Sequence, residues 1–186
     1  GPSSPRPALV ELVDWCRKQR VPTVFWNKED PAHFADFLET ARLFDHVFTT
    51  DSTKVPDYRE HLGHSRVGTL MFAAQPAIHN PVRPGPRHRT RDIAFAGMYF
   101  AHKYPERREQ MELLLGAADR VGRRMEHGLE IYSRHLGADP RYQFPTPLDQ
   151  RVVGSLPYDR MLSAYRGYRV FLNVNSVVTS PSMCAR

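Results

Sequence analysis

The sequence has little cysteine and no long apolar run. Its two cysteines, Cys16 and Cys184, lie far apart, whereas a disulfide framework needs more cysteines and a zinc site needs closer spacing. We therefore expect two reduced thiols in a cytoplasmic protein. No apolar stretch approaches the roughly 18 residues that a membrane-spanning helix needs, so we predict no membrane span.

Several catalytic signatures are missing as well. The sequence contains no glycine-rich phosphate loop followed by lysine and serine or threonine, no dinucleotide-binding fingerprint and no Gly-x-Ser-x-Gly turn. Its histidines show no spacing typical of metal ligands. We therefore predict neither a metal site nor a cofactor.

What the sequence does contain is a surplus of positive charge. Lysine and arginine number 26 against 20 aspartate and glutamate, for a net charge of +6. Much of the surplus lies in residues 83–91, which are rich in proline and arginine. A nucleic-acid-binding surface would interleave basic residues with aromatic ones or place them along a helix. We therefore interpret residues 83–91 as a linker and predict no nucleic-acid partner. The alternative is that this basic segment binds a nucleic-acid duplex, in which case the binding affinity should fall steeply with salt concentration.

Helical and strand patterns alternate along the first part of the chain. Residues 5–19 carry apolar side chains on one helical face. A second helix is predicted to open at Asp30-Pro31, because aspartate caps helices and proline fits the first turn. Asp51 is predicted to cap a third helix that stops at Gly63. Short apolar runs predict buried strands at residues 21–25, 46–50 and 66–72.

The same alternation resumes after the proline-rich segment. Helices are predicted at residues 105–123 and 158–165, and strands at residues 91–96, 129–132, 152–153 and 169–174. Strands joined by helical crossovers imply parallel sheets. We therefore predict an α/β fold of two Rossmann-like parallel-sheet segments, both incomplete. The expected domains are residues 3–82 and 92–186, joined by the linker 83–91.

Candidate site residues follow the predicted strands, because open parallel sheets bind ligands at the carboxyl ends of their strands. Trp26, Asn27, Glu29 and Asp30 follow the first strand, where they could orient an acceptor or supply a base. The alternative is that Asp30 only caps a helix and Trp26 only packs. Gln75 follows the third strand, at the junction of the two predicted domains.

The second predicted domain offers an anion site. Gly97 ends a strand and would let the backbone approach a ligand, while Lys103 and Arg107 near a helix start would attract phosphate. The alternative is that Gly97 only permits a turn. Asn175, Ser180 and Ser182 follow the last strand and form a second candidate site for an anion or a sugar hydroxyl, although Ser180 could serve only as a helix cap.

Six short segments, in order, resemble bacterial glycosyltransferases of the spore-maturation (CgeB-like) type. In the first half these are residues 24–31 (VFWNKEDP), 48–51 (FTTD) and 72–76 (FAAQP). In the second half they are residues 95–97 (FAG), 154–158 (GSLPY) and 171–176 (FLNVNS). The resemblance covers roughly residues 8 to 186.

The resemblance implies a GT-B-like architecture and metal-independent transfer of a sugar from a nucleotide sugar to an unknown acceptor. It places Glu29 and Asp30 as catalytic residues in the cleft. Trp26, Asn27 and Gln75, which follow strands of the same predicted domain, are the further candidates for the acceptor side. The residues that it places around the donor nucleotide sugar are Gly97, Lys103, Gly154, Tyr158, Asn175, Ser180 and Ser182, and Arg107 is added to this donor site from its position near the helix start.

Two departures from the family's pattern affect the expected activity. Met98 stands where related enzymes often carry arginine, and the donor-binding glutamate of such enzymes is expected after Arg186. We therefore expect this chain to be an inactive fragment, truncated at both ends, of a longer enzyme. The alternative is a non-catalytic binding or interaction module that keeps the Rossmann-like fold.

Overall fold

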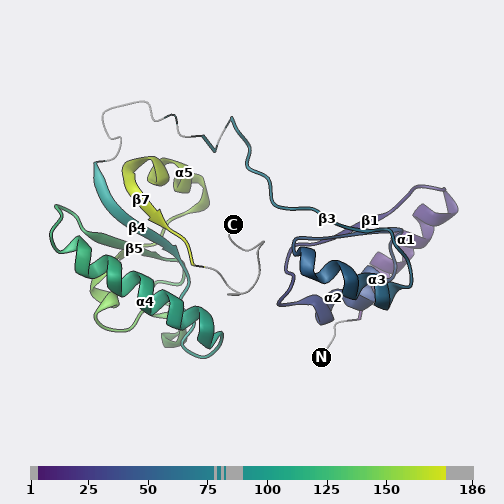
Figure 1. Ribbon diagram of the computed structural model, residues 1–186, viewed down its shortest axis with the longest axis horizontal. Helices are drawn as coiled ribbons and strands as arrows, with labels where there is room; N and C mark the ends of the chain where they lie inside the picture. Colours follow the sequence, from purple (N-terminus) through teal and green to yellow (C-terminus); the bar gives the residue numbers. More distant parts are fainter. Residues whose placement is uncertain (1–3, 78, 81, 83–89, 175–186) are drawn as a thin grey trace. The chain divides into compact units, whose positions relative to one another are not determined.

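The computed structural model describes residues 4–77, 79, 80, 82 and 90–174 (Figure 1). The chain divides into two compact units, the first ending at Ala73 and the second beginning at Ala74. Each unit contains one sheet, and every strand pair in both sheets is parallel. The predicted α/β fold with two Rossmann-like segments is therefore confirmed.

The first unit is a three-stranded sheet with strand order β1-β2-β3. Its elements are α1 (Pro7–Lys18), β1 (Val24–Asn27), α2 (Phe34–Ala41), β2 (His46–Thr49), η1 (Ser52–Lys54), α3 (Val55–Leu62) and β3 (Val67–Thr69). The register pairs Asn27 with Thr49 and Thr49 with Thr69. The last residues of the three strands therefore lie side by side at one edge of the sheet.

The core of the first unit is small and lies between the sheet and the helices α2 and α3. Its buried residues are Ala41, Val47, Tyr58 and Val67, and Phe25, Phe34 and Leu38 pack against them. Since alternate residues of a strand point to opposite faces, Phe25 and Asn27 of β1 face the same helices. This places the end of β1 beside the hydroxyl group of Tyr58.

The start of α2 differs from the sequence prediction. The helix begins at Phe34 and His33 takes the N-cap position, so Asp30 does not cap it. The physical reason is competition: both carboxylate oxygens of Asp30 accept hydrogen bonds from side chains of the core instead. Asp51 does cap a helical turn, because its carboxylate accepts from the backbone amide of Thr53, but this turn is the short 3-10 helix Ser52–Lys54 that precedes α3.

The second unit is a four-stranded sheet with strand order β6-β5-β4-β7. Its elements are β4 (Arg91–Gly97), α4 (Pro105–Gly122), β5 (Leu129–Ser133), η2 (Pro140–Tyr142), η3 (Leu148–Arg151), β6 (Val152–Gly154), α5 (Tyr158–Gly167) and β7 (Tyr168–Leu172). The register pairs Ala96 with Tyr132 and Gly97 with Ser133. The carboxyl ends of β4 and β5 therefore lie level with each other.

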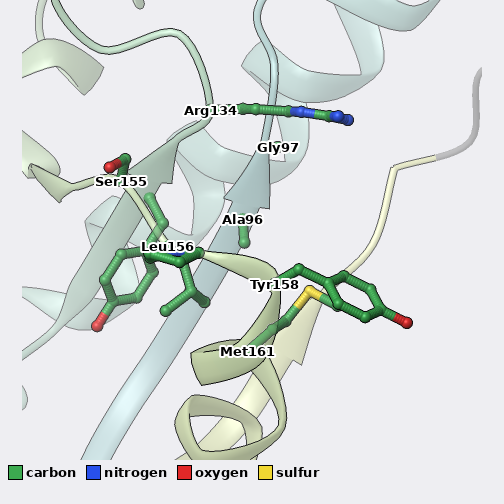
Figure 2. A pocket seen from close by; sticks show the side chains of 9 residues that line it. Ala96, Gly97, Arg134, Ser155, Leu156, Tyr158 and Met161 are labelled. Atoms are coloured by element: carbon green, nitrogen blue, oxygen red, sulfur yellow. The ribbon is translucent and has the colours of Figure 1, made fainter.

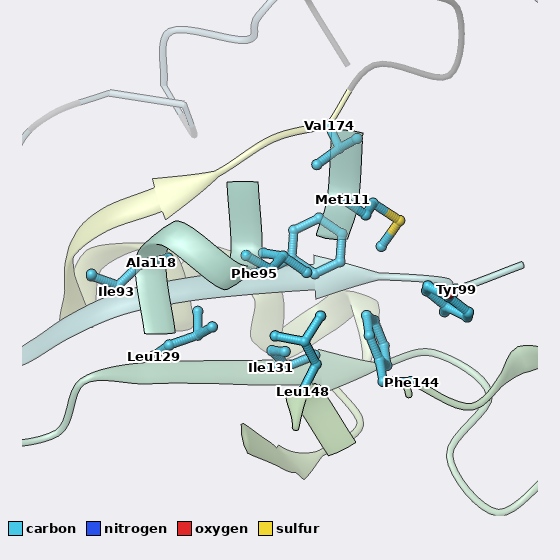
Figure 3. Close-up of a cluster of buried hydrophobic side chains, with 11 residues drawn as sticks. Ile93, Phe95, Tyr99, Met111, Ala118, Leu129, Ile131, Phe144, Leu148 and Val174 are labelled. Atoms are coloured by element: carbon cyan, nitrogen blue, oxygen red, sulfur yellow. The ribbon is translucent and has the colours of Figure 1, made fainter. Parts of the chain in front are cut away.

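The main hydrophobic core lies between one face of this sheet and α4 (Figure 3). Ile93, Phe95 and Ile131 of the strands pack with Met111 and Leu115 of the helix. The opposite face carries Ala94, Ala96 and Tyr132, which alternate with the core residues along the strands. Here α5 has no buried residue, so it covers its face of the sheet less completely than α4 does.

Candidate functional site

A cavity of about 580 Å³ opens at the carboxyl ends of β4, β5 and β6 in the second unit (Figure 2). Parallel sheets bind ligands at this edge. The cavity lies beside the start of α5. Its lining residues are Ala96, Gly97, Tyr132, Arg134, Ser155, Leu156, Pro157, Tyr158 and Met161.

The local sequence explains how this cavity forms. Gly154 ends β6 with φ of 153°, a value that side chains other than glycine rarely adopt. The chain then turns into α5, with Pro157 at the N-cap and no side chain capping the helix. Met161 follows Tyr158 by three positions and therefore lies on the same side of the helix. Ala96 is small and leaves space above the sheet.

Arg134 provides the positive charge of the cavity. Its backbone amide donates a 2.9 Å hydrogen bond to the carbonyl of Gly97, which holds it directly after β5. Figure 2 shows its side chain extending past Gly97 at the rim. Within the described part of the chain its guanidinium has no hydrogen-bond or ion-pair partner. The group therefore retains its full capacity to bind an anion.

Tyr158 lies at the mouth of the cavity, where it is 82% exposed. In Figure 2 its ring extends outward from the first turn of α5. An aromatic ring with this exposure is available for stacking against a planar ligand. The structure thus brings together two of the predicted donor-site residues, Gly97 and Tyr158, and places Gly154 directly before the lining residue Ser155.

Lys103 and Arg107, which are predicted to attract phosphate beside Gly97, do not line this cavity. The Nζ atom of Lys103 lies 4.9 Å from the ring centre of Phe100 and 5.1 Å from that of Tyr104. The guanidinium carbon of Arg107 lies 5.3 Å from the same Phe100 ring. Burial lowers the pKa of Arg107. Both cations are therefore held against aromatic rings at the start of α4.

Gly97 has a packing reason to be glycine. A Cβ atom at this position would lie 2.7 Å from Cζ of Phe95, closer than real contacts allow. Phe95 is buried in the main core, with 3% of its surface exposed. The lack of space beside Phe95 therefore explains why this position is glycine. Gly97 can have this structural role and still line the cavity.

The first unit holds a buried polar cluster at the carboxyl ends of β1 and β2, formed by Asn27, Asp30, Thr49 and Tyr58. The Nδ2 group of Asn27 donates to Oδ1 of Asp30 at 2.8 Å and to the Tyr58 hydroxyl at 2.9 Å. The Thr49 hydroxyl donates to Oδ2 of Asp30 at 2.6 Å. All four residues are buried. The cluster thus satisfies its polar groups internally.

The carboxyl group of Asp30 is shielded from solvent and from ligands. Burial raises the pKa of Asp30, and the hydrogen bonds from Thr49 and Tyr58 only partly oppose this. Burial likewise raises the pKa of Tyr58. The catalytic role that the resemblance implies for Asp30 stays a prediction, and the contacts of the carboxyl group are those of a structural residue.

The other predicted residues of the first unit are more accessible. Glu29 is exposed, and its backbone amide donates to Oδ1 of Asn27 at 3.0 Å. Trp26 donates from Nε1 to the carbonyl of Leu70 at 2.9 Å, and its ring lies 5.6 Å from that of Phe72. The hydrogen bond to Leu70 and the contact with Phe72 therefore account for part of the role of Trp26, in line with the alternative that this residue only packs.

The remaining predicted site residues are Gln75 and those that follow β7. Gln75 is exposed, and its backbone amide donates to Nδ1 of His79 at 3.0 Å. Asn175, Ser180 and Ser182 lie outside the described residues, as does most of the predicted linker.

Across the described ranges, no three histidine, cysteine, aspartate or glutamate side chains gather in a way that could hold a metal ion. No helix in those ranges has the length and apolarity to cross a membrane.

Comparison with known proteins gives no match: neither a protein-family model nor a curated protein sequence matches this chain. The resemblance to glycosyltransferases therefore rests on the six short segments alone.

Proposed function

We propose that this chain is part of a glycosyltransferase that moves a sugar from a nucleotide sugar to an acceptor without a metal ion. The observation that carries this proposal is the cavity at the carboxyl edge of the second sheet, at whose rim lies the guanidinium of Arg134, which has no partner among the described residues. Nucleotides combine a planar apolar ring with a chain of negative charge. The cavity offers a feature for each part.

Its interior suits the base and its rim suits the phosphates. Leu156 and Met161 provide apolar surface, and the rings of Tyr132 and Tyr158 provide stacking surface. Arg134 can pair with phosphate oxygens in a bidentate manner. The first amides of α5, which no side chain caps, carry the positive end of the helix dipole.

The proposed reaction breaks the bond between the anomeric carbon of the sugar and the diphosphate oxygen. The electron pair of that bond leaves with the nucleoside diphosphate, whose developing charge is stabilised by Arg134. The acceptor hydroxyl oxygen forms the new bond to the anomeric carbon, and its proton passes to a base. Of the two carboxylates that the resemblance implies as catalytic, Glu29 is exposed, whereas Asp30 is buried among its hydrogen-bond donors.

Calorimetric titration with nucleoside diphosphates tests the proposal. We expect one of uridine, guanosine, adenosine or thymidine diphosphate to bind the chain, and Arg134→Ala to weaken binding about tenfold, equivalent to about 1.4 kcal/mol. Arg124→Ala is the matched control, since Arg124 is exposed and does not line the cavity. Absence of binding by all four diphosphates would overturn the proposal.

A non-catalytic binding module is the second candidate, and the burial of Asn27 and Asp30 favours it. Burial removes two of the predicted site residues from contact with an acceptor. A transfer assay on the longer protein separates the two candidates. If the protein is an enzyme, the unmodified protein transfers sugar, and Glu29→Gln abolishes transfer but spares nucleotide binding. If it is a binding module, both the unmodified protein and the variant bind nucleotide and neither transfers sugar.

A further inference from the structure

A chain of hydrogen bonds leads away from the cavity wall through the second unit. The hydroxyl groups of Tyr132, which lines the cavity, and Tyr168 are 2.8 Å apart. The Tyr168 hydroxyl donates to Oε2 of Glu130 at 2.7 Å. Oε1 of Glu130 lies 3.0 Å from the guanidinium of Arg91. Four side chains from three neighbouring strands are thus joined.

The direction of each hydrogen bond in this chain follows from its charged end. The Tyr168 hydroxyl donates to one oxygen of Glu130, and the other oxygen pairs with Arg91. The proton of Tyr168 is therefore directed to Glu130. The oxygen of Tyr168 must then accept the proton of Tyr132, because its own proton is already used. Consequently the orientation of both hydroxyl groups is fixed.

The sheet leaves room for the two tyrosine rings to meet. Tyr132 lies on β5 and Tyr168 on β7, and β4 runs between these strands. The residues of β4 on the same face are Ala94 and Ala96, which pair with Glu130 and Tyr132. Because alanine is small, the Tyr132 side chain can extend over β4. The two rings lie edge to face, with centres 6.2 Å apart and planes at 89°.

We infer that Tyr132 is the aromatic surface against which the nucleotide base packs, and that Tyr168 and Glu130 are positioning residues that hold its ring. This inference rests on the proposed nucleotide-binding function and adds which residues bind the base. The phosphates pair with Arg134, so the two parts of the ligand depend on separate groups. A change in the tyrosine pair should therefore alter recognition of the base and spare recognition of the phosphates.

Calorimetric titration with two ligands separates recognition of the base from recognition of the phosphates. The ligands are uridine diphosphate, which carries a base, and inorganic pyrophosphate, which does not. If another nucleoside diphosphate binds more tightly, it is used in place of uridine diphosphate. We expect Tyr168→Phe to weaken nucleoside diphosphate binding about five- to tenfold, a fraction of what a full base–aromatic stack contributes. Binding of pyrophosphate should change by less than about twofold, because Arg134 is untouched. Tyr165→Phe is the matched control, because its ring packs on Phe171 at 4.3 Å, outside the hydrogen-bonded chain.

A second variant keeps the test decisive if Tyr168→Phe does not fold. Tyr132→Phe removes the same hydrogen bond and keeps the ring, so it should show the same selective loss. Equal weakening of both ligands, or no weakening of the diphosphate, overturns the inference while nucleotide binding by the unmodified chain still supports the proposed function. If the unmodified chain binds neither ligand, the proposed function fails and the inference fails with it.

Discussion

Thr49 donates a hydrogen bond of 2.6 Å to the carboxylate of Asp30, and both side chains are fully buried. Asn27 and Tyr58 complete the surroundings of that carboxylate. A buried carboxyl group whose hydrogen bonds come from neutral donors is costly to charge and costly to remove. The first unit therefore depends on this cluster in ways that measurements of stability can detect.

Replacing Asp30 by alanine should destabilise the first unit strongly. Asn27, Thr49 and Tyr58 would each lose a buried acceptor, at about 1–3 kcal/mol for each group left unpaired. Asp30→Asn keeps one carbonyl oxygen and should cost less. Urea unfolding followed by tryptophan fluorescence reports on this unit alone, because both tryptophans, Trp15 and Trp26, lie in it.

Asp14→Ala is the control for this measurement. Asp14 forms an exposed ion pair with Arg17 in the same unit, and such pairs contribute about 0–1 kcal/mol. If Asp30→Ala were no more destabilising than Asp14→Ala, the buried cluster would not be stabilising the unit.

The stability of the first unit should fall as pH rises through the folded-state pKa of Asp30. Burial raises this pKa above the ordinary value of 3.8, so the folded state holds the proton more tightly than the unfolded state. The contribution is fully present below 3.8 and is lost as pH rises. We expect Asp30→Asn to gain stability relative to the unmodified chain with increasing pH. A stability difference that is constant with pH would contradict this prediction.

Asp119 should show the opposite pH dependence in the second unit. Burial alone would raise its pKa, but hydrogen bonds and charges from Arg123 and Arg151 together lower it. The stability that Asp119 contributes is therefore present above 3.8 and is lost as pH falls. Arg151→Ala should cost about 1–2 kcal/mol at neutral pH, less than a fully buried pair because Arg151 is partly exposed.

Circular dichroism during urea unfolding measures this cost at neutral and acidic pH. Arg120→Ala is the control, because Arg120 lies on the exposed side of α4, one position from Asp119, and forms no ion pair within the described ranges. The effect of Arg151→Ala should shrink on acidification. An effect of the same size at both pH values would show that Arg151 stabilises by packing instead of charge.

Gly97→Ala should disturb both the core and the cavity. The new Cβ atom would lie 2.7 Å from the Phe95 ring, so Phe95 must move within a packed core. Such overpacking typically costs about 1–3 kcal/mol. Gly167→Ala is the control, because a Cβ atom there meets nothing within 4 Å. Thermal unfolding of both variants measures the difference, and equal melting temperatures would contradict the packing explanation.

The order of helices and strands could be predicted from the sequence because apolar runs and helix caps are local signals. The strand around Phe95 is a short apolar run, and the helix around Met111 carries its apolar buried residues Met111, Leu115 and Ala118 at helical spacing. The role of Asp30 could not be predicted in this way. Its carboxylate bonds to Thr49 and Tyr58, which are distant in sequence, so no local pattern distinguishes a cap from a core residue.

The cavity was predicted only in part. Gly97 ends a strand and Tyr158 belongs to a segment that carries the family resemblance, so both could be identified. Arg134 was missed, because a single arginine after a strand has no distinguishing pattern. The signal that finds it is the pairing of Gly97 with Ser133, which places the following residue at the rim. The pair formed by Tyr132 and Tyr168 likewise requires the strand order.

The position of β4 between β5 and β7 has a consequence during synthesis of the protein. Arg91 pairs with Tyr168, so one side of β4 has no partner until the ribosome has released a segment made much later. The first unit, by contrast, pairs strands that follow one another directly. Long-range strand pairing is slow and leaves an open edge. The strands of the first unit should therefore pair early during synthesis. The open edge of β4 in the second unit should require protection from aggregation until β7 has been synthesised.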